Sequence, residues 1–138
     1  MRLHANSARV IGGMAEFLID TNVFSRIFTG DRGVKLFVES LDAAVDTTVY
    51  VECLQGSKSN SEKRIVEGYL ARYELYHLTQ TVSAKTIELV RVYSNSYGLL
   101  LADALIAATC LCNDLTLVTY NVGDFQFIGG LKWLKPPV

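Results

Sequence analysis

The stretch Phe17-Leu18-Ile19-Asp20-Thr21-Asn22 runs three apolar residues directly into an aspartate and two further polar residues. An apolar run of this length indicates a buried strand, and Thr21 and Asn22 are residues that begin a following helix well. In an open parallel sheet, ligands bind beyond the carboxyl ends of the strands, so Asp20 is a candidate site residue. A capping turn alone would explain the same residues equally well.

Apolar runs of strand length alternate with helical patterns along the rest of the chain, which predicts an α/β domain with a mainly parallel sheet. The expected strands lie near Glu16–Asp20, Asp46–Val49, Tyr76–Thr79, Leu115–Thr119 and Leu131–Leu134. The expected helices lie near Asn22–Phe28, Gly33–Leu41, Tyr50–Gln55, Ser61–Tyr73, Ser83–Tyr97 and Ala102–Cys112.

Composition favours one globular domain. The chain has 138 residues, half of them hydrophobic, with 13 basic and 14 acidic residues, which argues against disorder and against a strongly basic nucleic-acid coat. No apolar run approaches the ~20 residues that span a bilayer, so no membrane association is expected. We expect residues 1–13 to be a loosely ordered extension and residues 14–138 to form a single domain.

The three cysteines fit a reducing, cytoplasmic location. Cys53, Cys110 and Cys112 lie in apolar surroundings and lack the paired spacing of a zinc ribbon. Cys110 and Cys112 are two residues apart in an expected helix, so their side chains point to different faces. They are better interpreted as buried thiols than as metal ligands.

Two further acids stand where a site would form. Glu52 follows the second expected strand at the opening of a short helix, in apolar surroundings where an unpaired carboxylate would be costly. Asp103 begins the run Ala102–Ala108, a helix of small and apolar residues that should be buried nearly all round. An acid interacting with the helix dipole is the simpler alternative for Asp103, but it does not exclude a ligand role.

More oxygen donors follow the fourth expected strand, in the turn Asn121-Val122-Gly123-Asp124. Crowded carboxylates repel one another unless a hard cation compensates them. Oxygen ligands without nearby histidine or thiol favour Mg²⁺ or Mn²⁺ over zinc. Such an ion can activate water and stabilise a leaving oxygen at a phosphodiester, so the pattern predicts a metal-dependent nuclease.

From about Phe17 to the end, the chain resembles the PIN domains, and among them the VapC-like toxins of toxin–antitoxin pairs. Each matching stretch is weak alone, but their order and spacing together are specific. The resemblance implies a three-layer α/β/α sandwich, an acidic Mg²⁺ or Mn²⁺ site, cleavage of single-stranded RNA, a homodimer and inhibition by an antitoxin. The stretches are Leu18–Val23, Glu52–Gly56, Ala102–Ala108 and Leu117–Phe125.

The resemblance assigns Asp20, Glu52 and Asp103 to the three core acids of the family. Its fourth acid lies in the turn after the fourth strand, where Asn121 holds one candidate position and Asp124 the other. Tyr120 stands where family members often carry a basic residue, which weakens the expected contact with phosphate. The further candidates for contact with substrate are Asn22, Arg26 and Thr119.

Setting aside the four candidate acids leaves 10 acidic residues against 13 basic ones, so the remaining surface is net positive. Some of these basic side chains could line a groove for phosphates, and solvated helix faces explain about half of them. The basic residues that follow the first two acids are Arg26, Arg32, Lys35, Lys58, Lys63 and Arg64.

Two other functions compete with the toxin ribonuclease. Asn121 and Tyr120 motivate a degenerate site that binds RNA or a protein without cutting. A phosphatase also places an aspartate at the first strand end, but it commonly needs a second acid two residues later, and that position is Asn22.

Overall fold

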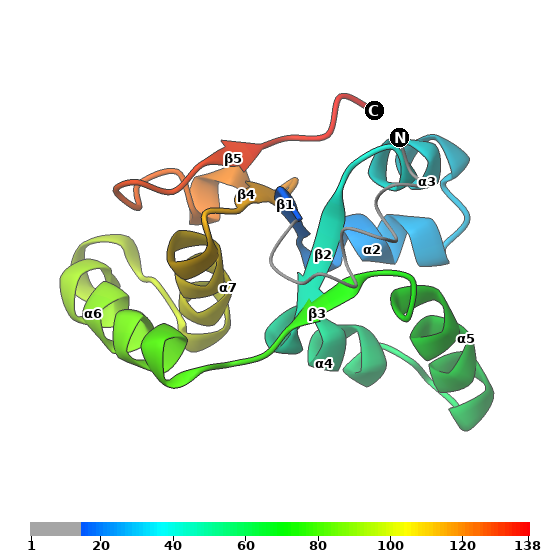
Figure 1. Ribbon diagram of the computed structural model, residues 1–138, viewed down its shortest axis with the longest axis horizontal. Helices are drawn as coiled ribbons and strands as arrows, with labels where there is room; N and C mark the ends of the chain where they lie inside the picture. The colour runs from blue at the N-terminus through cyan, green and yellow to red at the C-terminus, as the bar shows by residue number, and fades with distance from the viewer. Residues whose placement is uncertain (1–14) are drawn as a thin grey trace.

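The computed structural model describes residues 15–138, so the extension expected at residues 1–13 lies outside the described part. Five parallel strands form one sheet in the order β3-β2-β1-β4-β5 (Figure 1). The expected α/β fold with a parallel sheet is thereby confirmed. The strands are β1 (Phe17–Ile19), β2 (Ala43–Asp46), β3 (Glu74–Tyr76), β4 (Thr116–Val118) and β5 (Trp133–Leu134).

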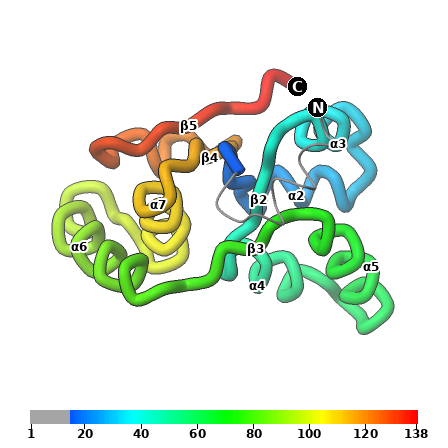
Figure 2. The backbone as a smooth tube through the Cα atoms, viewed as in Figure 1, coloured from blue at the N-terminus to red at the C-terminus, as the bar shows by residue number. Residues whose placement is uncertain are grey.

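Helices cover both faces of the sheet, giving the three layers that the resemblance implied (Figures 1 and 2). The crossovers from β1 to β2 and from β2 to β3 carry four helices on one face, and the crossover from β3 back to β4 carries two on the other. The first four are α2 (Thr21–Phe28), α3 (Arg32–Glu39), α4 (Thr47–Gln55) and α5 (Asn60–Leu70). The last two are α6 (Gln80–Tyr97) and α7 (Leu101–Asn113), and the short 3-10 helix η1 (Val122–Asp124) follows β4.

The order of the strands reverses between β1 and β4, because β1 leads outward to β2 whereas the chain later returns to the other side of β1. The carboxyl ends of two adjacent strands open a crevice at such a point, where parallel sheets bind ligands. The residues immediately after these two strands are Asp20 and Thr119.

Both faces of the central strands are buried, as expected for a parallel sheet. Leu18, Ile19 and Leu117 have no exposed surface. Alanines at positions 104, 107 and 108 let α7 lie close to the sheet, and all three are fully buried. The small residues of this helix therefore serve packing, and they fix the place of Asp103 in its first turn.

Two of the expected strands were placed too far along the chain. The second strand was expected at Asp46–Val49, but β2 ends at Asp46, whose side chain accepts a hydrogen bond from the backbone N–H of Val49 and caps α4. The third was expected at Tyr76–Thr79, but Thr79 caps α6 in the same way. At the second strand, the capping side chain of Asp46 outweighed the strand preference of the β-branched residues Thr47, Thr48 and Val49.

All three cysteines are free thiols, and Cys53 and Cys110 are buried, in line with their expected role in the core. Burial and the nearby carboxylates of Glu52 and Asp20 raise the pKa of the Cys53 thiol to about 12, so it stays protonated and unreactive. Among residues 15–138, no helix is long and apolar enough to cross a bilayer.

Candidate functional site

Asp20 lies at the carboxyl end of β1 and caps α2, and both of its carboxylate oxygens are held. Oδ1 accepts from the backbone N–H of Thr21 at 2.8 Å. Oδ2 accepts from the Asn22 amide at 3.0 Å and from the Thr119 hydroxyl at 2.8 Å. Burial raises the pKa of Asp20, these three donors oppose that shift, and the charge of Glu52 adds to it. The side chain is thus a fixed, desolvated carboxylate that faces other acids.

Thr119 and Asn22 support Asp20 from behind. The hydroxyl of Thr119 is fully buried, donates to Asp20, and accepts from the Asn22 amide and from the backbone N–H of Asn121. Asn22 also accepts from the backbone N–H of Tyr120 through its Oδ1 at 3.1 Å. The polar atoms of both side chains are therefore engaged within the protein, which argues for orientation of Asp20 rather than for the expected contact with substrate.

Glu52 reaches the same place from α4. It lies in the second turn of that helix rather than at its opening, so the helix dipole does not account for it as the sequence suggested. Its Oε1 accepts a hydrogen bond from the hydroxyl of Thr21, the residue after Asp20. This bond joins two segments that are 31 residues apart and turns the Glu52 carboxylate toward Asp20.

Asp103 faces the other acids from the first turn of α7, on the opposite side of the sheet from α4. Burial, followed by the charges of Asp20, Asp124 and Glu52 in that order, raises the pKa of Asp103 to about 6. Each of these carboxylates is therefore close enough to influence Asp103. In the turn after β4, it is the charge of Asp124 that reaches Asp103, whereas Asn121 bonds through its backbone N–H to Thr119.

One acid near the site was not a candidate from the sequence. Asp46, at the end of β2, has no exposed surface. Burial raises its pKa to about 6, and the charges of Asp20 and Glu52 contribute. A signal was present, since Val45-Asp46-Thr47 repeats the pattern of Ile19-Asp20-Thr21. Placing the strand three residues late concealed it.

The oxygen donors of the candidate acids suit a hard cation, although their carboxylates do not converge as the ligands of one ion would. Within residues 15–138, no three His, Cys, Asp or Glu side chains converge closely enough to hold an ion. The charge of Glu52 nevertheless adds to the raised pKa of Asp20, and the charges of Asp20, Asp124 and Glu52 add to that of Asp103, so these acids lie near one another. The fold determines that these carboxylates are neighbours, whereas the distances between their oxygens change with side-chain rotation.

A family model for the PIN domain matches residues 17–128. This chain belongs to the PIN-domain family. A curated relative of this PIN domain, ribonuclease VapC10 of Mycobacterium tuberculosis, is 34% identical to it over 85 residues. That match covers 61% of the chain and spans only 62% of the relative's length.

Solved structures share the fold over most of the PIN domain. A toxin–antitoxin complex from Klebsiella pneumoniae has a TM-score of 0.72 and 27% identity, covering 84% of this chain and 95% of that one. The DNA-bound VapBC structure from Salmonella typhimurium has a TM-score of 0.77 and 21% identity, covering 88% and 98%. At that second identity the likeness shows the fold alone.

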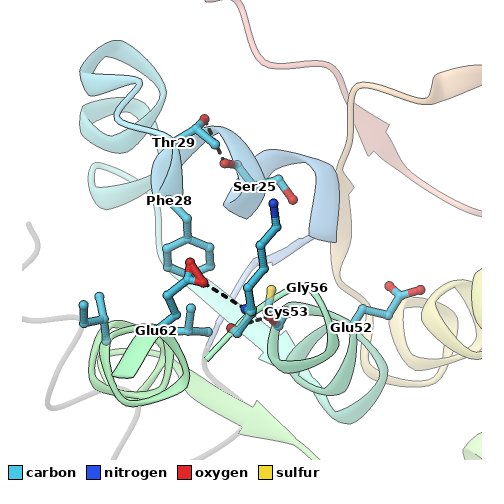
Figure 3. A pocket seen from close by; sticks show the side chains of 11 residues that line it. Ser25, Phe28, Thr29, Glu52, Cys53, Gly56 and Glu62 are labelled. Carbon is cyan, nitrogen blue, oxygen red and sulfur yellow. Dashed lines mark hydrogen bonds between the residues drawn. The ribbon is translucent and has the colours of Figure 1, made fainter. Parts of the chain in front are cut away.

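A groove of about 440 Å³ runs between α2, α4 and α5 of the PIN domain. Glu52 lies at the end of this groove that is farther from Phe28 and Glu62 (Figure 3). Of the candidate acids, Glu52 is the one that also lines this groove. Its lining mixes apolar, hydroxyl and charged side chains, among them Ser25, Phe28, Lys58, Glu62, Ile65 and Val66.

Proposed function

We propose that this PIN domain is a divalent-metal-dependent endoribonuclease, the toxin of a toxin–antitoxin pair, that hydrolyses phosphodiester bonds in single-stranded or loop RNA. The observation that carries the proposal is the placement of Asp20 and Asp103 at the strand-order reversal, where burial and the charges of neighbouring acids, Glu52 among them, raise the pKa of both carboxyl groups. Carboxylates kept together at such a cost to the metal-free protein indicate a cation that offsets their charge. The sequence relative is itself a ribonuclease.

Each acid has a distinct part in the proposal. Asp20 is fixed by three hydrogen bonds and supplies a preorganised ligand. Glu52 and Asp103 come from helices on opposite faces and close the site from two sides, and Asp124 completes it from the turn. When bound, Mg²⁺ or Mn²⁺ supplies an activated water and charge compensation at the phosphate. The side chains of this chain hold that ion and orient it.

The proposal is tested by incubating the purified protein with structured RNAs, with and without Mg²⁺ or Mn²⁺. Cleavage is expected only with the metal, and EDTA should abolish it. The metal should also raise the thermal unfolding midpoint, because it binds the folded state and relieves repulsion among the acids. Cleavage that survives EDTA would contradict the proposal.

The absence of a ready-made three-ligand cluster in residues 15–138 favours one alternative, an inactive PIN domain that binds RNA or a protein. The two functions differ in one measurement. A rise in the unfolding midpoint with Mn²⁺, combined with no cleavage of any RNA tested, would favour the binding module over the enzyme.

We propose that the partner of this PIN domain is an antitoxin that covers the groove between α2, α4 and α5. Ile65, on the rim of the groove, is 68% exposed, and the negative charges of Glu52 and Glu62 exceed the positive charge of Lys58. A partner segment with apolar and basic residues would match this lining. Because Glu52 belongs to both the groove and the acidic site, such a segment would also close the site.

Ile65→Thr is expected to weaken binding of the antitoxin by about tenfold, because an apolar side chain buried in an interface contributes about 1.5 kcal/mol or more. The measurement is titration of the purified antitoxin, the product of a short reading frame adjoining the gene. Ile87→Thr, at an exposed position on α6, is the matched control and should leave binding unchanged. Equal affinities for the two variants would place the antitoxin elsewhere.

We further propose that the protein is a homodimer that pairs through the end of α6 and the start of α7. Exposed apolar side chains gather there, with Tyr97 59%, Leu100 73% and Leu101 67% exposed. Light scattering of the purified protein should give about twice the mass of the chain. Leu100→Asp should halve that mass, and a monomer in the unmodified protein would rule the dimer out.

A further inference from the structure

The guanidinium of Arg26 stacks over the aromatic ring of Tyr120. Arg26 extends from α2, and its Cζ lies 4.1 Å from the centroid of the ring of Tyr120, the second residue after β4. A guanidinium over an aromatic face at this distance is attracted by the negative charge density of the ring. The contact joins two residues that lie on either side of the strand-order reversal.

Tyr120 is held at both ends. Its backbone N–H donates to Oδ1 of Asn22 at 3.1 Å, and its hydroxyl donates to the backbone carbonyl of Val138 at 2.9 Å. The ring is half-buried between these two bonds. Because Asn22 also donates to Asp20, the position of the ring is tied directly to the acidic site.

Arg26 stands on the same face of α2 as Asn22, four residues further along the helix. That separation corresponds to about 6 Å along the helix axis from the residue that binds Asp20. The Arg26 side chain is 50% exposed, and its contact with Asp31 is a long one at 3.9 Å, beyond hydrogen-bond range. Its donors therefore remain open to a ligand that approaches the acidic site.

We propose that Tyr120 is a positioning residue that holds Arg26 so that the guanidinium binds an RNA phosphate next to the one being cleaved. This inference rests on the proposed function. It replaces the expectation that a tyrosine at position 120 weakens contact with phosphate. The cation comes instead from α2, and the ring after β4 fixes where it stands. A guanidinium suits this task because it can stack on a ring while its edge donates to phosphate.

The test is binding of a fluorescent single-stranded RNA, measured in EDTA over a range of salt concentrations, so that cleavage plays no part. Arg26→Ala should weaken binding about fivefold to tenfold and reduce the salt slope by about 0.7, the value for one lost phosphate contact on a single strand. Tyr120→Met should cause most of the same loss, although the charge is retained. Tyr120→Phe keeps the ring and should bind within about twofold of the unmodified protein.

A double variant separates positioning from a general structural effect. If the ring acts through Arg26, the Arg26→Ala and Tyr120→Met double variant should bind no more weakly than Arg26→Ala alone. Arg91→Ala, an exposed arginine on α6 across the sheet, is the matched control and should bind as the unmodified protein does. Thermal unfolding identifies any variant that fails to fold. Should Tyr120→Met be such a variant, Tyr120→Leu replaces it in the comparison.

The outcomes distinguish this inference from the proposed function. Losses that add in the double variant, or normal binding by Tyr120→Met, would overturn the positioning role while leaving metal-dependent cleavage intact. If the variants show the expected RNA affinities but the unmodified protein cleaves no RNA, the role of Tyr120 is supported and only the proposed cleavage activity is overturned. Failure of the unmodified protein to bind RNA in EDTA would overturn the phosphate contact of Arg26, whereas cleavage in the presence of metal is decided by the separate assay with Mg²⁺ or Mn²⁺. In active protein, Tyr120→Met should raise KM and leave kcat nearly unchanged.

Discussion

Asp103→Asn is expected to lower RNA cleavage by about 100-fold or more while making the metal-free protein more stable. The substitution keeps the shape of the side chain and removes its charge, so the site loses a ligand without losing packing. Burial and the charges of Asp20, Asp124 and Glu52 raise the pKa of Asp103 to about 6, so the charged form that prevails at neutral pH is less stable in the folded protein than in the unfolded one. Removing that charge relieves the repulsion.

The measurements are single-turnover cleavage of one RNA and thermal unfolding in EDTA. Asp114→Asn provides the control, because it makes the same chemical change at the opposite end of α7. Asp114 is exposed there, and its Oδ1 lies 2.8 Å from Nζ of Lys132. Asparagine also tolerates the left-handed backbone of that position, with φ of 53°. The control should keep full activity. Full activity in Asp103→Asn would remove the acid from the proposed site.

The local pattern of the sequence was enough to predict the central part of the fold. Phe17-Leu18-Ile19 forms β1, and Asp20 follows it at the strand-order reversal as expected. Asp20, Glu52 and Asp103 were each chosen for their position relative to an apolar run, and the structure brings their charges within reach of one another. The three acids lie near one another because parallel strands share one carboxyl edge, and their role in a catalytic site stays a prediction.

The parts that could not be predicted depend on contacts between distant segments. Thr47-Thr48-Val49 favours a strand by its β-branched residues, yet it forms the first turn of α4 because Asp46 caps it. Thr119 was expected at the substrate, but its buried hydroxyl is bonded to Asp20, 99 residues away. The contact of Arg26 in α2 with Tyr120 after β4 likewise joins distant segments, and no local sequence pattern predicts it.

Asp46→Asn is expected to stabilise the metal-free protein at pH 7.5 by about 1 to 3 kcal/mol, since one pKa unit corresponds to about 1.4 kcal/mol. Burial, with a smaller contribution from the charges of Asp20 and Glu52, raises the pKa of Asp46 to about 6 in the folded protein. The folded state therefore holds the proton more tightly than the unfolded state. Protonation of Asp46 therefore stabilises the folded state fully at low pH, and this stabilisation is lost as the pH rises through 6.

The hydrogen bonds of Asp46 also suit a neutral side chain. Oδ1 accepts from the backbone N–H of Val49 at 2.8 Å, which an asparagine oxygen can replace. Oδ2 lies 3.2 Å from the hydroxyl of Thr109, whose single hydrogen has a shorter contact, 2.9 Å, with the carbonyl of Leu105. A protonated acid or an asparagine amide can donate to that hydroxyl, whereas a carboxylate competes with Leu105 for its hydrogen.

Chemical denaturation between pH 5 and 7.5 in EDTA tests this expectation. As the pH rises from 5 to 7.5, the unmodified protein should lose about 1 to 1.5 kcal/mol more free energy of unfolding than Asp46→Asn does. The two proteins differ only at position 46, and asparagine there does not titrate. Asp46→Ala is the matched control: it loses the cap of α4 and should be destabilised by about 1 kcal/mol or more at pH 5. Parallel pH profiles for the unmodified protein and Asp46→Asn would show that Asp46 is already ionised in the folded state at pH 5. The acidic site would then tolerate a further buried charge that its neighbours should oppose.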